Sequence, residues 1–422
     1  MTKLSPFVDK RKYRPSHVLL MGPSGVGKTE LSRCLADLTN APFISTNATS
    51  FSQVGYVGRA VTEILDDLVD AAEAKYLEMA RSSMRDDPNA RKKGEGLLRS
   101  WAVAQPWFPH VQASADVAVM NAKTKKEKKQ KKKLSLASLL EQKWDTSRIP
   151  LENTRRWSDL YNDTSMPVSY PMYLNGRDAL MLATETVMVQ HLLQEDWQQK
   201  AFQMAESSGV IFIDEIDKLA MSVGNGQHGS VSTSGVQRDL IPLLSGSEVN
   251  LQRRGVTMKT DNILFVCAGA FLVAKPEDML PELRGRLANV VDLAPLTKDE
   301  LLEILQSPHS IASQKCQLLR PEGIELTFAD EALDLVADIA EEMNKTDNFG
   351  ARRLSMLVEK LLTDVGVQLE QHPRAEKLSS EERQASDLST RIRVDQEWVS
   401  EELAHELEEK NRRQQLMESL LI

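Results

Sequence analysis

Eight consecutive residues near the N-terminus have the types and spacing of a phosphate-binding loop. They are Gly22, Pro23, Ser24, Gly25, Val26, Gly27, Lys28 and Thr29. Glycines let successive backbone N–H groups of such a loop point at phosphate oxygens, and the helix that follows adds its positive end. Lys28 can reach the β- and γ-phosphates, and Thr29 can offer its hydroxyl to Mg²⁺. The spacing therefore predicts a site for ATP and Mg²⁺.

A second group of chemically competent residues follows an apolar strand, Val210 to Asp214, and ends in Glu215. Open α/β folds bind their ligands at the carboxyl ends of such strands. Asp214 would hold the Mg²⁺, directly or through water, and Glu215 would polarise an attacking water molecule. Together the two motifs indicate a hydrolytic ATPase rather than a kinase, because a carboxylate beside the metal ligand suits the activation of water.

The elements that must position these residues are short apolar strands alternating with helices. Strands are predicted at His17–Met21, Phe43–Ile44, Gly209–Asp214, Ile263–Ala268 and Val290–Leu293. Helices are predicted after Lys28, where Leu31, Leu35 and Leu38 have helical spacing, at Val61–Met79 and near 179–204. Alternation of this kind predicts an α/β fold with a parallel sheet covered on both faces.

The pattern changes twice along the chain and predicts four segments. Periodicity is lost over about 82–173, where prolines and a lysine tract occur, and strand signals nearly vanish after Pro295. We therefore predict the first part of the nucleotide-binding domain at 1–78 and a mostly helical insertion domain at 79–200. The second part of the nucleotide-binding domain follows at 201–295, and a small helical C-terminal domain at 296–422.

Composition excludes several classes of protein. The net charge is −9 and aromatic residues make up 5%, which disfavours a nucleic-acid binder. The stretch Lys123–Lys133 alone carries +7 and predicts a solvated arm. The longest apolar run, Ile263–Ala274, is shorter than the roughly 20 residues of a membrane span. Three scattered cysteines predict a reducing compartment, and no motif supplies a peptidase nucleophile.

Six short motifs occur in an order that resembles the HslU (ClpY) family, the AAA+ unfoldase subunits of a two-component protease. They are Gly22–Thr29, Gly55–Gly58, Val210–Lys218, Gln237–Leu244, Pro281–Leu287 and Gly350–Leu354. The resemblance is close over about 16–75 and 205–300, and it implies an AAA+ fold and a ring, most often a hexamer, with ATP sites between subunits. Arg286 would be the finger extended to the neighbouring site, and Arg352, rather than Arg353, would be the second sensor.

The same resemblance assigns two further roles. Gly55, Tyr56, Val57 and Gly58 would form a pore loop that grips protein substrates, although a simple turn with a packed tyrosine fits these four residues as well. The terminal Leu420, Leu421 and Ile422 would dock on an HslV-type peptidase, or else pack within their own chain.

Two departures from the family leave alternatives. The chain opens almost at its first strand, so a Gly-Gln motif that helps to hold adenine is missing or lies upstream; Cys267 and Ala268 stand where a polar first sensor is usual. The alternatives are a non-hydrolysing subunit of a mixed ring with a sister ATPase and an AAA+ nucleic-acid remodeller. The lysine tract favours the mitochondrial matrix over the bacterial cytoplasm.

Overall fold

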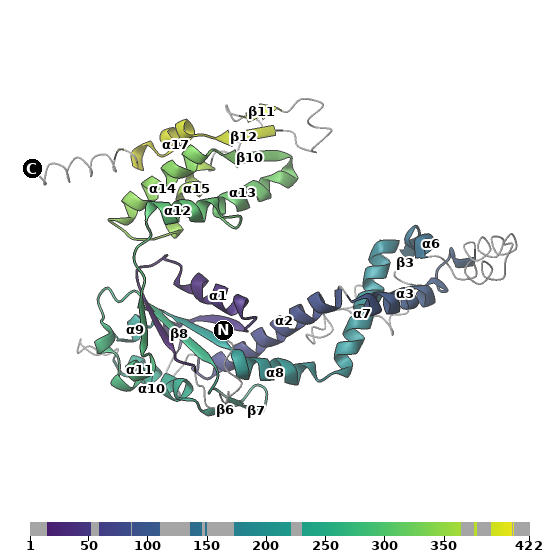
Figure 1. The fold of residues 1–422 in the computed structure, drawn as a ribbon, viewed down its shortest axis with the longest axis horizontal. Helices are drawn as coiled ribbons and strands as arrows, with labels where there is room; N and C mark the ends of the chain where they lie inside the picture. The colour runs from purple at the N-terminus through teal and green to yellow at the C-terminus, as the bar shows by residue number, and fades with distance from the viewer. Residues whose placement is uncertain are drawn as a thin grey trace, which may run out of the picture. The chain divides into compact units, whose positions relative to one another are not determined.

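A computed structural model describes residues 15–51, 59–85, 87–109, 136–145, 148–149, 173–220, 230–363, 375–377, 390–406 and 408 (Figure 1). Its contacts divide the chain into two units. One consists of Met1–Leu68 together with Ser208–Ile422, and the other is Val69–Ser207. Among the described residues, no helix is long and apolar enough to cross a membrane.

The first unit is built on a five-stranded sheet in the order β2-β5-β8-β1-β9. The strands are β1 (Val18–Met21), β2 (Phe43–Asn47), β5 (Val210–Asp214), β8 (Leu264–Gly269) and β9 (Asn289–Asp292). Every pairing is parallel, with Leu19 opposite Cys267 and Ile211 opposite Phe265. The central strands are buried because helices cover the sheet. The predicted α/β fold with a parallel sheet is confirmed.

Helix α1 (Lys28–Leu38) packs on β5 and β8 through its small residues. Ser32 and Ala36 are buried, whereas Leu31, Leu35 and Leu38 are 54%, 48% and 84% exposed. The leucine spacing therefore predicted the helix correctly without marking its buried face. Small side chains face the sheet here because the helix follows the phosphate loop directly and lies close to the strands.

Further helices and a pair of strands complete this part of the unit. They are α2 (Glu63–Arg85), which runs past Leu68 into the second unit, α9 (Asp217–Ala220), α10 (Ser230–Ser245), the antiparallel pair β6 (Glu248–Leu251) and β7 (Val256–Lys259), and α11 (Pro281–Arg286). Single turns of 3-10 helix lie at Ala48–Ser50 and Pro276–Asp278.

The C-terminal part contains α12 (Lys298–Gln306), α13 (Ile311–Leu319), β10 (Ile324–Phe328), α14 (Asp330–Asn344), α15 (Arg352–Leu361), β11 (Ala375–Lys377), β12 (Thr390–Val394) and α17 (Gln396–Glu402), with a 3-10 turn at Arg320–Glu322. Figure 1 shows β10, β12 and β11 side by side beside the helices. The predicted helices are present, but this sheet was not predicted. Apolar residues alternate with polar ones in Ile324–Phe328 and in Arg391–Val394, a period of two that indicates strands and that matches their burial.

The second unit is mostly helical, with α3 (Pro88–Ala102), α6 (Leu136–Leu140), α7 (Gly176–Gln194), α8 (Trp197–Ser208) and the short pair β3 (Lys143–Asp145) and β4 (Tyr173–Asn175). Its core contains the buried indoles of Trp101 and Trp144, and the Trp144 indole N–H donates to the Leu139 carbonyl at 3.1 Å. Asp87 caps α3 in front of Pro88, a helix start that lies inside the stretch without clear period. The lysine tract lies outside the described residues.

Candidate nucleotide-binding site

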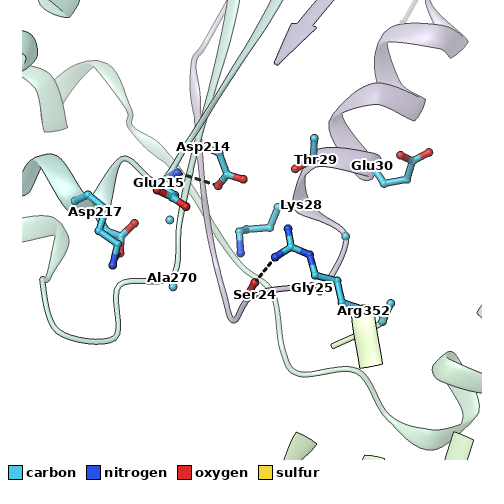
Figure 2. Close-up of a pocket in the computed structure, with 14 residues that line it drawn as sticks. Ser24, Gly25, Lys28, Thr29, Glu30, Asp214, Glu215, Asp217, Ala270 and Arg352 are labelled. Atoms are coloured by element: carbon cyan, nitrogen blue, oxygen red, sulfur yellow. Dashed lines mark hydrogen bonds and ion pairs between the residues drawn. The ribbon is translucent and has the colours of Figure 1, made fainter. Parts of the chain in front are cut away.

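A cavity of about 420 Å³ lies at the carboxyl end of the parallel sheet (Figure 2). Four separate parts of the chain line it: residues 24–30 with the exception of Val26, residues 214–218 with the exception of Ile216, Gly269 with Ala270, and Ala351 with Arg352. Three of the four follow the ends of strands β1, β5 and β8, and the fourth comes from the start of α15. The cavity therefore brings together the phosphate loop, the carboxylates and Arg352.

The backbone of the phosphate loop depends on glycine at three positions. Gly22, Gly25 and Gly27 have φ values of 147°, 77° and 90°, a region that residues with a Cβ rarely adopt. A Cβ on Gly22 would also lie 2.6 Å from the Leu293 carbonyl oxygen. The loop conformation is thus fixed by residue type, as the spacing of the motif predicts.

The side chain of Lys28 folds back into the phosphate loop. Its ammonium donates hydrogen bonds of 2.8 Å to the carbonyls of Gly22 and Pro23. Burial sets the pKa of Lys28 below its ordinary value, although the negative charges of Asp214 and Asp217 act in the opposite direction. The ammonium is therefore partly desolvated in a pocket that holds both signs of charge, where an incoming phosphate interacts with it more strongly than in water.

The two predicted carboxylates lie at the end of β5. The Asp214 carboxylate accepts a 2.9 Å hydrogen bond from the Glu215 backbone N–H. Glu215 has a φ of 55°, a left-handed conformation that is uncommon for a residue with a side chain. Figure 2 shows Asp214 and Glu215 on one side of the pocket and Thr29, Lys28 and Arg352 on the other. The turn at Glu215 thus places both carboxylates against the pocket instead of continuing the strand.

The residues present fit a magnesium ion held together with phosphates. Thr29 contributes a hydroxyl and Asp214 a carboxylate to the pocket lining, and both are the oxygen ligands that Mg²⁺ prefers. Among the described residues, no group of three or more His, Cys, Asp or Glu side chains could hold a metal ion by itself. Mg²⁺ is usually bound by one or two protein groups, substrate phosphates and water, and Thr29 with Asp214 would supply the protein groups.

Asp217 also lines the pocket, and the sequence analysis gave it no role. The residue is 2% exposed, and within the described part of the chain its Oδ1 has no hydrogen-bond partner. Its Oδ2 lies 4.0 Å from the Lys218 ammonium. A third acid two positions after Glu215 was the available signal.

The structure separates the two adjacent arginines of the C-terminal motif. The Arg352 guanidinium donates to the Ser24 hydroxyl at 3.2 Å in the pocket (Figure 2). Arg353 is buried instead, donates to the Asp347 carbonyl at 2.7 Å and lies 4.6 Å from the centroid of the Phe349 ring. Arg352 is the residue of the pair that can reach a bound phosphate.

The turn before Arg352 touches the phosphate loop directly. The Ala351 N–H donates to the Gly25 carbonyl at 3.0 Å. A Cβ on Gly25 would lie 1.9 Å from the Phe349 carbonyl oxygen, and a Cβ on Gly350 would lie 2.5 Å from the Gly25 carbonyl. Glycine at both positions permits this contact between backbones.

The remaining predicted residues do not meet in this cavity. Arg286 is exposed at the end of α11 and is absent from the pocket lining. Cys267 and Ala268 are buried within β8 and are absent from the pocket lining, to which the end of β8 contributes Gly269 and the following residue Ala270. Burial raises the pKa of the Cys267 thiol to about 12. The predicted pore loop, Gly55–Gly58, and the tail, Leu420–Ile422, lie outside the described residues.

Comparison with known proteins agrees with this geometry. Residues 18–81 match the model of the ATPase family associated with various cellular activities (AAA), and residues 168–302 match the AAA domain (Cdc48 subfamily). The ATP-dependent protease ATPase subunit HslU of Hyphomonas neptunium is 38% identical over 382 residues, which cover 86% of this chain and 83% of that protein. The chain belongs to the HslU family. The predicted family and the ATPase activity that it carries are confirmed.

Membership of the HslU family accounts for the position of the pocket. The first matched segment contains the phosphate loop, and the second contains the strand that ends at Asp214 together with Arg286. The chain therefore binds ATP as an AAA ATPase. Arg352 lies beyond both segments that match the family models. The match to the HslU relative is longer and covers 86% of this chain.

Proposed function

We propose that this chain hydrolyses ATP in the cavity described above and uses the energy to unfold proteins for a separate peptidase. The observation that carries the proposal is the meeting of Lys28, Thr29, Asp214, Glu215 and Arg352 around one cavity. The similar protein from Hyphomonas neptunium is named as the ATPase subunit of an ATP-dependent protease.

Each residue has a part in the proposed reaction. Lys28 binds the β- and γ-phosphates in place of the carbonyls of its own loop, and Arg352 adds a second positive charge. Thr29 and Asp214 hold Mg²⁺, which supplies positive charge against the phosphate oxygens. Glu215 accepts the proton of the attacking water, because its carboxylate lies beside the metal-binding residue.

The proposed assembly is a ring, either a homohexamer or a mixed ring with a sister ATPase. In the ring, Arg286 extends to the γ-phosphate of the neighbouring subunit; its exposed position outside its own pocket supports this role. Tyr56 and Val57, between Gly55 and Gly58, grip protein substrates. Leu420, Leu421 and Ile422 dock on an HslV-type peptidase.

Glu215→Gln tests the hydrolytic part of the proposal. Because the amide cannot accept the proton of water, we expect turnover to fall by about 10²–10⁴-fold while ATP still binds. Steady-state ATPase assays and titration with a fluorescent ATP analogue measure both. Glu303→Gln, which removes the same charge from the exposed surface of α12, is the control. Unchanged hydrolysis by Glu215→Gln would remove this residue from the mechanism.

Deletion of Leu420–Ile422 tests the proposed partner. Each aliphatic side chain contributes about 1.5–3 kcal/mol when fully buried, and a ring repeats the contact. The truncated chain should assemble and hydrolyse ATP but fail to stimulate a purified HslV-type peptidase. Normal stimulation, or loss of ring assembly, contradicts the docking role.

The proposed compartment is the mitochondrial matrix, with the bacterial cytoplasm as the alternative. Its support is the charge of the lysine tract, Lys123–Lys133. Fractionation of the source cells, with detection of the chain in matrix or in cytoplasm, decides between the two.

A further inference from the structure

Gln237 on α10 joins two elements that are far apart in the sequence. Its side chain is fully buried. The amide Nε2 donates to the Leu219 carbonyl at 2.9 Å, and the amide Oε1 accepts from the Leu280 N–H at 2.8 Å. These partners lie 18 and 43 residues away along the chain. One side chain therefore connects α9 with the residue that precedes α11.

The carboxamide of Gln237 satisfies both partners because it carries a donor and an acceptor. The Leu280 N–H can only donate and the Leu219 carbonyl can only accept, which also fixes the orientation of the amide. An ionised glutamate would still accept from the Leu280 N–H but could not donate to the Leu219 carbonyl. An apolar side chain would remove the hydrogen bonds to both backbone groups. The N-cap residue of α11, Leu280, has an apolar side chain that makes no capping hydrogen bond, and Gln237 supplies a polar contact at this helix start.

The two joined elements carry different parts of the proposed chemistry. Leu219 lies in α9, which begins at Asp217 immediately after the carboxylate segment that lines the pocket. Leu280 immediately precedes α11, which buries Leu283 and ends at the exposed Arg286. Gln237 therefore lies between the carboxylates of one site and the arginine that leaves it.

We propose that Gln237 is a positioning residue for Arg286. It holds the start of α11 at a fixed distance from α9, so that Arg286 is presented correctly to the adjoining subunit's site. The proposal rests on the function proposed above for Arg286, and it adds that each finger is placed by the carboxylate segment of its own subunit. Loss of the amide then impairs hydrolysis in the neighbour's pocket, not in the chain's own.

Gln237→Met tests this in the assembled protein. Displacement of a reacting group by about 1 Å can cost roughly 10²-fold in rate, so kcat should fall by about 10- to 100-fold while affinity for a fluorescent ATP analogue is kept. Gln237→Asn, one methylene shorter, is the second variant if Met impairs folding. Thr260→Val is the matched control, because Thr260 also makes two buried hydrogen bonds, to Leu243 and Ser247, without joining α9 to α11.

Mixed assemblies supply the readout that a general structural defect would not move. Glu215→Gln subunits have no functional base but carry an intact finger, so mixing them with Gln237→Met subunits should restore hydrolysis in the Gln237→Met pockets. Mixing Glu215→Gln with Arg286→Ala should restore it in the same way. Thr260→Val alone should retain the kcat of the unmodified chain.

The outcomes separate the two proposals. The inference about Gln237 is wrong if Arg286→Ala abolishes hydrolysis while Gln237→Met retains full kcat. It is also wrong if Gln237→Met is not rescued in the mixture. In both cases the role proposed for Arg286 is unaffected. If Arg286→Ala retains full activity, the function proposed for Arg286 fails and the inference falls with it. Rescue of both variants by Glu215→Gln supports the inference.

Discussion

Two segments of this chain that carry arginines are each held by a side-chain carboxamide that bonds to backbone groups. Gln237 anchors the start of the helix that ends at Arg286. Asn344 anchors the turn before Arg352, since its amide donates to the Gly350 carbonyl at 3.2 Å and accepts from the Phe349 N–H at 3.1 Å. In each case a buried carboxamide satisfies one backbone donor and one backbone acceptor.

The two carboxamides differ in how far along the sequence their hydrogen-bond partners lie. Those of Asn344 span six and five residues, so they close a local turn whose arginine bonds to Ser24 in the chain's own pocket. Those of Gln237 join segments far apart in the sequence, and the arginine beyond them is exposed. The local anchor positions an arginine in the pocket of its own chain, whereas the long-range anchor positions an arginine that lies outside that pocket.

The largest expected difference concerns the arginines themselves. Arg286→Ala should reduce kcat of the assembled ATPase by about 10³-fold or more, the scale of arginine fingers supplied from outside a site. Binding of ATP by dissociated subunits should stay the same. Steady-state kinetics of the assembled protein and nucleotide titration at low subunit concentration measure the two effects.

Arg352→Ala should behave in the opposite way. Loss of a charged hydrogen bond of about 1.5–3 kcal/mol should weaken ATP binding about 10- to 100-fold, at every subunit concentration, because the contact lies within one chain. Arg353→Ala is the comparison, since this neighbouring guanidinium packs against Phe349 outside the pocket lining. Equal effects of Arg286→Ala and Arg352→Ala on dissociated subunits would remove the distinction.

A smaller effect is expected at the local anchor. Asn344→Leu leaves the Phe349 N–H without its partner and removes one of the two donors to the Gly350 carbonyl, which still accepts from the Arg353 N–H at 3.1 Å. This should reduce the free energy of unfolding by about 1–3 kcal/mol and weaken ATP binding through Arg352. Asn344→Asp keeps an acceptor for the Phe349 N–H, so its stability should lie between that of the unmodified chain and that of Asn344→Leu. Urea denaturation of each variant, with and without ATP, measures the loss; an unchanged midpoint for Asn344→Leu would contradict the anchor role.

The smallest effect reports on Arg286 through His17. The His17 ring donates to the Leu244 carbonyl and accepts from the Phe265 N–H, so it is neutral in the fold. Burial lowers the pKa of His17, the hydrogen bond to Leu244 opposes this, and the charge of Arg286 lowers the pKa further.

The unfolded chain therefore takes up a proton that the folded chain resists. The contribution of neutral His17 to the free energy of unfolding is fully present above its unfolded pKa of about 6.5. It is lost as the pH falls below that value, by at most about 1.4 kcal/mol per pH unit. His17→Gln should flatten this loss, and Arg286→Ala should reduce it slightly. Urea midpoints at successive pH values provide the measurement; a pH profile unchanged by His17→Gln would exclude His17 as its source.

Contiguous residues allowed much of the site to be predicted. The phosphate loop, from Gly22 to Thr29, specifies its own conformation through its glycines, and an apolar strand that ends in Asp214 and Glu215 places both acids at the sheet edge. Both signals are local, because each depends on the backbone of a few neighbouring residues. They were sufficient to predict an ATPase with a parallel sheet.

The sequence alone left other features undecided. The composition and spacing of Arg352 and Arg353 do not separate the two; the family resemblance favoured Arg352, and the hydrogen bonds of the two guanidinium groups show that Arg352 is the one in the pocket. The pairing of β10 with β12 was missed because it joins residues separated by a helix-rich stretch and more than sixty positions.

The sequence by itself thus determined the phosphate loop, the pair of carboxylates and the parallel sheet, because backbone conformation and strand burial follow from adjacent residues. Only the tertiary structure decided the position of Asp217, the contact of Arg352 with Ser24 and the two hydrogen bonds of Gln237. Each of these depends on backbone groups brought together by folding. A buried amide or carboxylate has a role only once its partners are known, and those partners lie elsewhere in the chain.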